Sequence, residues 1–421
     1  MGYQIFLVAL SSLLLSCISA APSKPEPIIQ VRDRGTTLPF VARLNVSGST
    51  LPEIDRAHVA GLKERARKLQ NDSTHFQDKR QSSFGVINEA VFYVASVGVG
   101  TPASLFELII DTGSSNTWVG SGRAFSETSS SQTNGQLMEV TYGSGFVVGQ
   151  QFTDTVTLGP DLVIEQQQIG VAIISQGFEG VDGILGVGPV DLTQGTLQND
   201  PNAFVPTVSD NLLSQGAISE EVLGIFFAPT TSVVAANGEL TFGGIDSSKI
   251  TQDVQFFPLT STFPASEFWG IDQSVTYGTS GTTILSTTAG IVDTGTSLLL
   301  LATDGFDAYT AATGSTLDQN TGLLSISSAN YANLQSLFLN VGGSTFEFTK
   351  NAQTWPRALN TAIGAPSNAI LLIVNDLGSP SGEGFDFVDG FVFLERFYSV
   401  FDTTNNRIGF ATTAHTNDLV N

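Results

Sequence analysis

Two aspartates carry the clearest chemical signal in this chain. Asp111 and Asp293 each end an apolar run and are each followed by Thr-Gly, a hydroxyl residue and Ser. A buried strand that ends in an acid places a carboxylate where charge is costly unless it is hydrogen-bonded, and the hydroxyls of Thr112, Ser114 and Ser115 could supply such bonds. One such motif is most simply a turn, with Gly113 allowing the sharp bend. Two copies 182 positions apart, about a domain length, indicate a duplicated chain whose halves share a site.

Elimination also leaves carboxylates as the reactive groups. Outside residues 1–80 the only histidine is His415, in the C-terminal tail, which is a poor base for a Ser-His-Asp triad. The Gly-x-Ser-x-Gly and His-Glu-x-x-His patterns do not occur. The single cysteine, Cys17, lies in an N-terminal apolar run, so the rest of the chain has no thiol nucleophile, disulfide framework or cysteine metal site. We therefore expect no metal and no cofactor.

Charge divides the 421 residues into two parts. Residues 21–80 carry 11 Lys and Arg against 7 Asp and Glu, a net of +4, whereas residues 81–421 carry 6 against 32, a net of −26. Phosphates would be repelled by so acidic a body, so nucleic-acid binding is excluded. Surplus acid can serve solubility alone, or it can indicate a protein adapted to low pH.

Short apolar runs alternate with Gly, Ser and Thr turns from residue 84 onward, which predicts an all-β fold. Residues 140–148 predict a β-hairpin with a glycine tip. Helices are predicted only at residues 56–70, 204–216 and 328–338. We divide the acidic body into lobes at residues 81–255 and 256–421, each with one of the two aspartates.

Together, the DTGSS and DTGTS motifs at this spacing resemble the pepsin-like aspartic endopeptidases. The resemblance runs from about residue 89 to 414 and includes the segments 93–102 and 407–410. The lack of cysteine is similar to the polyporopepsin type from basidiomycete fungi. The resemblance implies a bilobal pepsin-like acid protease fold, with two related β-barrel-like lobes and a cleft between them.

The resemblance also assigns roles to individual residues. It implies that Asp111 and Asp293 are catalytic, that they activate a water without a covalent intermediate, and that the hairpin is a flap over the cleft. It implies substrate contacts by Tyr142, Gly143, Ser144, Gly113, Gly295 and Thr296, and supporting positions for Ser114 and Trp118. Hydrophobic residues flanking the cut are then preferred, through a cleft lined by Tyr142, Trp118 and Phe178.

One segment departs from the family pattern. Asp389-Gly390 stands where the family usually has Leu-Gly-Asp, so an acid precedes the glycine instead of following it. Asp389 is a possible third acid near the site, but we favour a structural role.

The N-terminal segments predict export and a precursor form. Residues 1–20 are apolar and end in small residues, as in a secretory signal cleaved near Ala20 or Ala21. Residues 21–80 predict a basic propeptide that ends at about 80–90, near the Lys79-Arg80 pair. Asn45 and Asn71 begin glycosylation sequons within it. Ionised carboxylates would hold this segment near neutral pH, and protonation would weaken the hold. The resemblance supports this, because pepsin-like enzymes are made as zymogens.

These observations predict a secreted monomeric enzyme that acts on proteins and peptides, with its own propeptide as a partner; a vacuolar location is the alternative. No later segment predicts a membrane span. A catalytically silent relative that binds proteins is the first rival, but such relatives usually lose a catalytic acid, the flap tyrosine or a motif glycine. A glycoside hydrolase, which also uses paired carboxylates, does not explain the duplicated motif.

Overall fold

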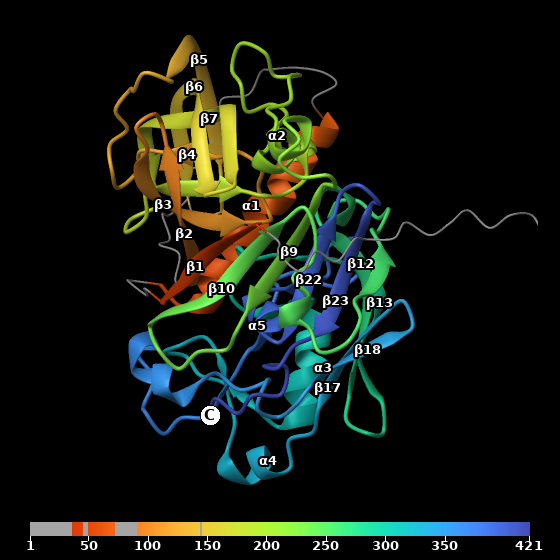
Figure 1. Cartoon of the computed structure of the whole chain (residues 1–421). Helices are drawn as coiled ribbons and strands as arrows, with labels where there is room; N and C mark the ends of the chain where they lie inside the picture. Colours follow the sequence, from red (N-terminus) through yellow and green to blue (C-terminus); the bar gives the residue numbers. More distant parts are fainter. Residues whose placement is uncertain (1–35, 45–48, 72–90, 144) are drawn as a thin grey trace, which may run out of the picture.

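The computed structural model describes residues 36–44, 49–71, 91–143 and 145–421. Strands dominate these residues and helices are few, and the strands curl into two barrel-like bodies, one above the other in Figure 1. The predicted all-β, bilobal fold is confirmed. The predicted signal peptide, the sequon at Asn45 and the Lys79-Arg80 pair lie outside the described residues, as does most of the sequon at Asn71.

One large sheet extends through both halves of the molecule. Its thirteen strands, among the described residues, run in spatial order β11 (Gln255–Pro258), β23 (Arg407–Thr412), β22 (Phe397–Asp402), β9 (Val222–Phe227), β10 (Val234–Phe242), β1 (Thr36–Leu44), β2 (Val91–Val99), β3 (Ser104–Asp111), β8 (Gly183–Gly186), β4 (Trp118–Val119), β7 (Leu162–Gln176), β6 (Phe146–Gly159) and β5 (Gln132–Thr141). β11 spans the predicted lobe boundary at residue 255, which stays a prediction.

The remaining elements belong mainly to the C-terminal half. A seven-stranded sheet has the order β18 (Ser344–Phe348), β17 (Leu337–Val341), β12 (Gly270–Tyr277), β13 (Thr282–Val292), β21 (Phe387–Asp389), β14 (Leu299–Leu301) and β20 (Val374–Asp376). A small sheet contains β15 (Thr316–Leu317), β16 (Leu324–Ser325) and β19 (Leu371–Leu372). The α-helices of the described residues are α1 (Leu51–Asn71), α2 (Val208–Ser214), α3 (Thr303–Thr313), α4 (Ser328–Ala332) and α5 (Phe391–Leu394).

A repeated arrangement of strands positions the two aspartates. In the first half, β3 runs parallel to β8, and β4 pairs antiparallel with β8. In the second half, β13 runs parallel to β21, and β14 pairs antiparallel with β21. β3 ends at Asp111 and β13 ends one residue before Asp293. The duplication inferred from the motifs is therefore a duplication of this three-strand unit.

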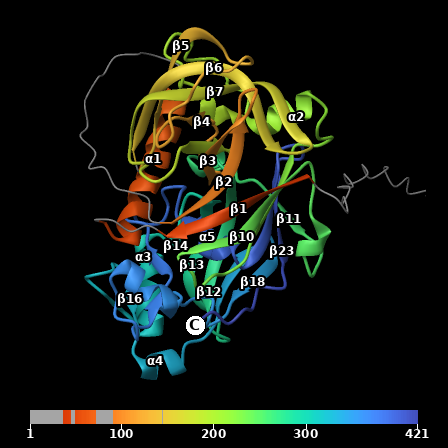
Figure 2. The same cartoon turned by 60° about the vertical axis from the view of Figure 1, so that its left-hand side comes forward.

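The N-terminal strand β1 lies in the middle of the large sheet. It pairs antiparallel with β10 from Thr36 to Arg43 and with β2 from Phe40 to Leu44. Leu38, Phe40 and Ala42 are buried in the core. Figure 2 shows the strand crossing between the two halves. Part of the segment predicted as a basic propeptide is thus a strand of the large sheet.

Helix α1 also belongs to that basic segment. Its start resembles a capping box, since Glu53 Oε2 accepts hydrogen bonds from the backbone N–H and the hydroxyl of Thr50, at 2.8 and 2.9 Å. Leu51, Ile54 and Leu62 recur at helical spacing and are buried, whereas Arg67 is exposed. The helix extends from the upper body to the lower one (Figure 2). The helix predicted at residues 56–70 is confirmed, and it begins earlier.

The structure confirms two of the other local predictions and corrects a third. The hairpin at 140–148 is confirmed as β5 and β6, whose register runs from Thr141 opposite Phe146. The helix at 204–216 is confirmed as the shorter α2, residues 208–214. The helix at 328–338 is wrong beyond Ala332, because Leu337 begins β17, which is held on both sides by β12 and β18. Sheet pairing outweighs the local helical pattern there.

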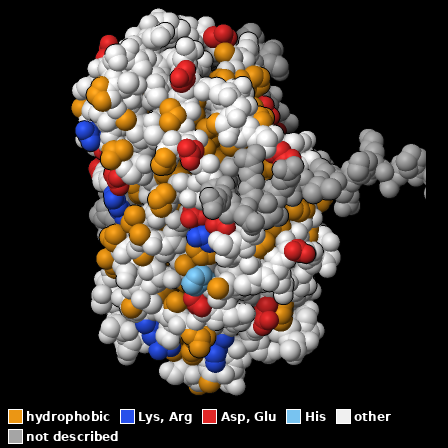
Figure 3. All heavy atoms as spheres, viewed as in Figure 1, with side chains coloured by type: hydrophobic (Ala, Val, Ile, Leu, Met, Phe, Trp, Pro, Cys, Tyr) orange, Lys and Arg blue, Asp and Glu red, His pale blue; other side chains and the backbone are white. Residues whose placement is uncertain are grey.

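No helix among the described residues is both long and apolar enough to cross a membrane. On the face viewed in Figure 3, acidic side chains are scattered and not gathered into one patch. The acid surplus on this face is therefore a general surface property.

Candidate active site

Asp111 and Asp293 meet at the centre of the molecule. Their residues are 2% and 0% exposed. One carboxylate oxygen of each and Nε2 of His58 lie within 4.8 Å of one another. The two predicted acids are therefore brought together, with a histidine that the sequence analysis had not placed there.

Reciprocal hydrogen bonds join the loops that follow the two acids. Thr112 N donates to Thr294 Oγ1 at 3.0 Å, and Thr294 N donates to Thr112 Oγ1 at 2.9 Å. Thr294 Oγ1 also donates to the carbonyl oxygen of Ile110 at 3.0 Å. This symmetric pair of bonds fixes the separation of the two acids. The repeated threonine of the motifs was the available signal, but sequence reasoning gave Thr112 only a local role.

Each carboxylate is held by its own loop. Asp111 accepts from Gly113 N at 2.8 Å and from Ser114 Oγ at 2.5 Å. Asp293 accepts from Gly295 N at 3.1 Å and from Thr296 Oγ1 at 2.7 Å. Such bonds offset the cost of burying ionised acids.

The three hydroxyls expected around Asp111 have different hydrogen-bond partners. Ser114 bonds Asp111, and Thr112 reaches across to Asp293 at 3.4 Å. The expectation for Ser115 is wrong, because Ser115 Oγ donates to the carbonyl oxygen of Pro189 at 2.5 Å. That bond ties the loop to the chain that follows β8 instead.

Neighbouring atoms leave little room for a side chain at either motif glycine. Neither Gly113 nor Gly295 has a positive φ. A Cβ on Gly113 would lie 2.9 Å from Asp293 Oδ1, and a Cβ on Gly295 would lie 3.0 Å from Asp111 Oδ1. The chain bends at Thr112 and Gly113, as expected, and a side chain at Gly113 would also press against the opposite carboxylate.

The two acids differ in their affinity for a proton. Burial, and then the charge of Asp293, raise the pKa of Asp111 above its ordinary value. Burial acts in the same direction on Asp293, but the charge of His58 and hydrogen bonds from His58, Thr296 and Gly295 hold the pKa of Asp293 below its ordinary value. A protonated Asp111 beside an ionised Asp293 is therefore the favoured state over a range of acid pH.

The hairpin between β5 and β6 lies over this pair. Tyr142 Oη accepts a hydrogen bond from Trp118 Nε1 at 2.9 Å, and both residues are buried. Phe178 packs edge-on against both rings, with ring centres 4.9 Å from Trp118 and 5.3 Å from Tyr142. The three aromatic residues expected to line the cleft thus form one cluster. Ser144 lies outside the described residues.

Helix α1 occupies the cleft between the hairpin and the two acids. His58 Nε2 lies 3.0 Å from Asp293 Oδ2, and the His58 and Asp293 side chains are 4% and 0% exposed. Gly61 and Gly143 pack backbone to backbone, with no room for a side chain on either. A cavity of about 20 Å³ lies between the helix, the first acid loop and the hairpin. The helix therefore fills the place that a substrate would need.

Further side chains fasten the helix to both halves. Asp55 accepts from Ser297 N at 3.0 Å and Leu298 N at 2.8 Å, directly after the second motif. Arg65 donates to the carbonyl oxygens of Leu192, at 2.6 Å, and Gln194. Sequence reasoning missed His58 and Asp55, because nothing in their spacing relates them to acids far along the chain.

A divalent metal ion prefers ligand atoms of the kinds offered here by His58, Asp111 and Asp293. Each of them is already engaged in the hydrogen bonds described above.

Asp389 lies behind the second acid. Its backbone carbonyl accepts from Asp293 N at 3.2 Å, and its Oδ1 accepts from Gln273 Nε2 at 3.1 Å. The residue is fully buried, and burial raises the pKa of Asp389 to about 7. A neutral acid that holds two strands together suits the structural role.

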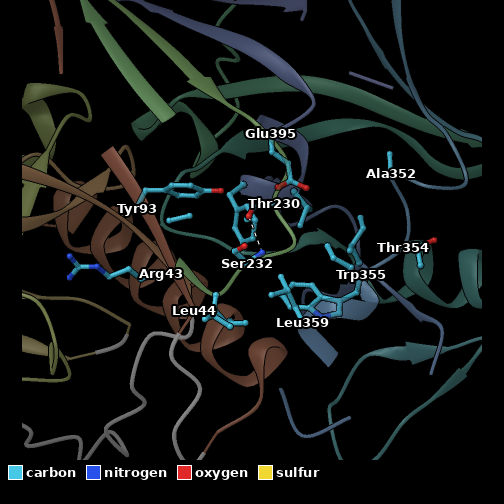
Figure 4. Close-up of a pocket in the computed structure, with 16 residues that line it drawn as sticks. Arg43, Leu44, Tyr93, Thr230, Ser232, Ala352, Thr354, Trp355, Leu359 and Glu395 are labelled. Carbon is cyan, nitrogen blue, oxygen red and sulfur yellow. Dashed lines mark hydrogen bonds between the residues drawn. The ribbon is translucent and has the colours of Figure 1, made fainter. Parts of the chain in front are cut away.

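A second cavity lies apart from these groups, beneath β1. It measures about 30 Å³, room for a water molecule and too little for an organic ligand. The Tyr93 hydroxyl and the Glu395 carboxyl point toward its interior (Figure 4). Burial raises the pKa of Glu395 to about 7. This cavity is a place for a buried neutral acid and not a second active site.

Fold and site together define a class of protein: two related β bodies, each supplying one Asp-Thr-Gly loop to a shared pair of buried acids. The chain belongs to the eukaryotic aspartyl proteases, whose family model matches residues 92–413. It is 58% identical to polyporopepsin of Irpex lacteus over 329 residues, covering 78% of this chain and 96% of that protein. It is 29% identical to human gastricsin over 340 residues, covering 76% and 81%.

A solved structure agrees with this assignment. The crystal structure of the aspartic proteinase from Irpex lacteus matches with a TM-score of 0.78 and 50% identity, covering 92% of this chain and all of that one. The chain is an aspartic endopeptidase of the pepsin-like type, as the resemblance implied.

Proposed function

We propose that this protein is a secreted acid endopeptidase made as an inactive precursor, with Asp111 and Asp293 as its catalytic pair. The observation that carries the proposal is the helix α1 seated on the two acids through His58. The buried pair with pKa values shifted in opposite directions supports the catalytic assignment. The apolar residues 5–20 support secretion.

Catalysis follows from the shared proton. A water held between the acids loses a proton to the ionised carboxylate, which acts as general base, and attacks the peptide carbonyl. The protonated carboxyl donates a hydrogen bond to the carbonyl oxygen, and a proton then passes to the leaving amine. Two carboxylates that share one proton are the general catalytic device of aspartic proteases. Ser114 and Thr296 orient the two carboxylates through the bonds described above.

Substrate binding is assigned to the hairpin and to the acid loops. In this proposal Tyr142, Gly143 and Ser144 contact the peptide from the hairpin, and Gly113, Gly295 and Thr296 contact it from below. The aromatic cluster of Tyr142, Trp118 and Phe178 supports a preference for hydrophobic residues beside the cut.

Residues 21–80 act in this proposal as the propeptide. Three of its basic side chains are engaged by the acidic body: His58 lies on Asp293, Arg43 on Glu107 at 2.7 Å, and Lys63 near Glu383 at 3.8 Å. These contacts give the opposite net charges of the two parts a structural basis.

Protonation of different buried acids changes the docking of α1 in opposite directions as pH falls. His58 lowers the pKa of Asp293 in the docked form, so ionised Asp293 favours the docked helix, and this contribution is lost as pH falls through the lowered pKa. Asp55 acts in the opposite sense. Burial raises its pKa to about 6, so protonation of Asp55 favours the docked state as pH falls. Release therefore requires that the loss of the Asp293 contribution exceed the gain from Asp55.

The test compares the wild-type precursor with the Asp111→Asn and Asp293→Asn variants, all collected from culture medium. On acidification the wild type loses its N-terminal segment and cleaves casein, and both variants lose activity by roughly 10⁴-fold. N-terminal sequencing and circular dichroism follow processing and folding. A folded Asp111→Asn protein with normal acid proteolysis would contradict the catalytic pair. A wild type that is active with residues 21–80 still attached would contradict the precursor assignment.

A further inference from the structure

We propose that the open cleft contains a subsite for a basic substrate side chain, formed by Ser379, Glu383 and Phe385 and filled in this form by Lys63 of α1. The inference rests on the proposed function, because the subsite becomes available only when α1 leaves. It assigns to the C-terminal half a charge preference additional to the hydrophobic one.

Lys63 occupies a site built for an ammonium group. Its Nζ donates to Ser379 Oγ at 2.8 Å and lies 3.8 Å from Glu383 Oε2. The same atom lies 5.4 Å from the centre of the Phe385 ring. The Lys63 side chain is only 11% exposed. A hydroxyl acceptor, a carboxylate and an aromatic face thus surround one cation.

The walls of this subsite are held independently of Lys63. Phe385 packs edge-on against Phe268, with ring centres 5.9 Å apart. The buried Asp386 accepts from Gly382 N at 2.7 Å and from Glu383 N at 3.1 Å, and Thr288 donates to it as well. The loop is therefore pinned by its own backbone bonds, and departure of α1 leaves its shape in place.

Negative charge also remains when Lys63 leaves. Burial lowers the pKa of Lys63, and the charges of Glu383 and Asp386 oppose that shift. Both carboxylates therefore act on whatever occupies the position. A lysine or arginine side chain of a substrate would restore the lost pairing, whereas an acidic one would be repelled.

Another cation of α1, Arg65, lies against the opposite wall. Arg65 donates to the backbone carbonyl oxygens of Leu192 and Gln194 in the N-terminal half. Carbonyl oxygens accept from any N–H group and do not by themselves select for charge. The predicted charge preference therefore belongs to the C-terminal wall.

The helix also indicates how far the subsite lies from the cut. Lys63 follows His58 by five positions in α1, which is about 7.5 Å along a helix axis. An extended peptide advances about 3.3 Å per residue. A substrate side chain would reach the subsite from the second or third residue away from the scissile bond.

The test uses acid-activated enzyme and one hydrophobic peptide substrate with a single variable position. Lysine, norleucine or glutamate is placed in turn at each of the three residues on either side of the cut. Assays run at about pH 5, where most exposed carboxyl groups are ionised. We expect lysine to exceed norleucine by about fivefold in kcat/KM at a second or third position, with glutamate below both.

Two variants connect that preference to the subsite. In Glu383→Gln the lysine and norleucine peptides are cleaved about equally, and in the control Glu347→Gln the preference is kept. Glu347 is an exposed residue of β18 that accepts a bond from Ser336. Circular dichroism of Glu383→Gln shows that the variant has folded, and the ratio of lysine to norleucine cleavage is the quantity compared.

The possible failures are distinguishable. If acid yields no active enzyme, the precursor assignment fails. If active enzyme shows no lysine preference at any position, or if Glu383→Gln retains a preference, the subsite inference is overturned while the proposed function stands.

Discussion

Replacing His58 with leucine tests the contact that seats α1 on Asp111 and Asp293, the proposed catalytic pair. The contact joins Nε2 and Asp293 Oδ2 at 3.0 Å between side chains that are 4% and 0% exposed. Removing the partner of a buried charge can cost about 3–5 kcal/mol, but Asp293 can take up a proton shared with Asp111 and so avoid part of that cost. The appropriate range is then about 1.5–3 kcal/mol, that of a hydrogen bond to a charged group.

That range predicts a helix that opens on the order of 10- to 100-fold more often at neutral pH. Hydrogen–deuterium exchange of the α1 amides in intact precursor at about pH 6.5 measures the opening directly. The pH at which activation reaches its half-maximal rate should also move toward neutrality, because His58 is what lowers the pKa of Asp293 in the docked form.

Two controls accompany this variant. Arg67→Gln changes an exposed residue of the same helix and should leave exchange and activation unchanged. The mature enzyme released from His58→Leu should have wild-type kcat/KM, since residue 58 leaves with the propeptide. If His58→Leu shows wild-type exchange and activation pH, the argument that His58 holds the helix is refuted.

Two further predictions concern buried acids. Asp389→Asn should retain activity at acid pH within about threefold, because an acid whose pKa is about 7 is already neutral there and an amide resembles it in shape. A peptide-cleavage assay measures this activity. A loss comparable to that of Asp293→Asn in the same assay would place Asp389 among the reacting groups. For Glu395, a pKa of about 7 instead of 4.5 means that the precursor loses stability as pH rises through 7, by roughly 3 kcal/mol. In Glu395→Gln calorimetry should therefore show a smaller fall in Tm between pH 5 and 8, and an equal fall would contradict the assignment.

The parts of the site that sequence could predict are those encoded by local repetition. Asp111 and Asp293 were found because each motif is a contiguous strand and turn, and a duplicated unit implies a shared site. The hairpin carrying Tyr142 was found for the same reason, since alternation and a glycine tip are local signals.

The remaining features depend on contacts distant in the chain. Whether α1 lies on solvent or on the acids is decided by partners such as Asp293, 235 positions from His58, which no periodicity reveals. The helix predicted at 328–338 ends at Ala332, because β17 is stabilised by two neighbouring strands. The sequence predicted the bend at Gly113 but not the atom that a side chain there would meet, because Asp293 Oδ1 belongs to the other half.

The position of β1 has a consequence for the lifetime of the released enzyme. If residues 21–80 depart, β2 and β10 lose the strand between them, and a gap of about 9.5 Å opens in the middle of the sheet. Their backbone groups must then find other partners or water. The chain would thus acquire its fold around a strand that it later discards, and the height of the unfolding barrier would then help to set the lifetime of the shortened enzyme.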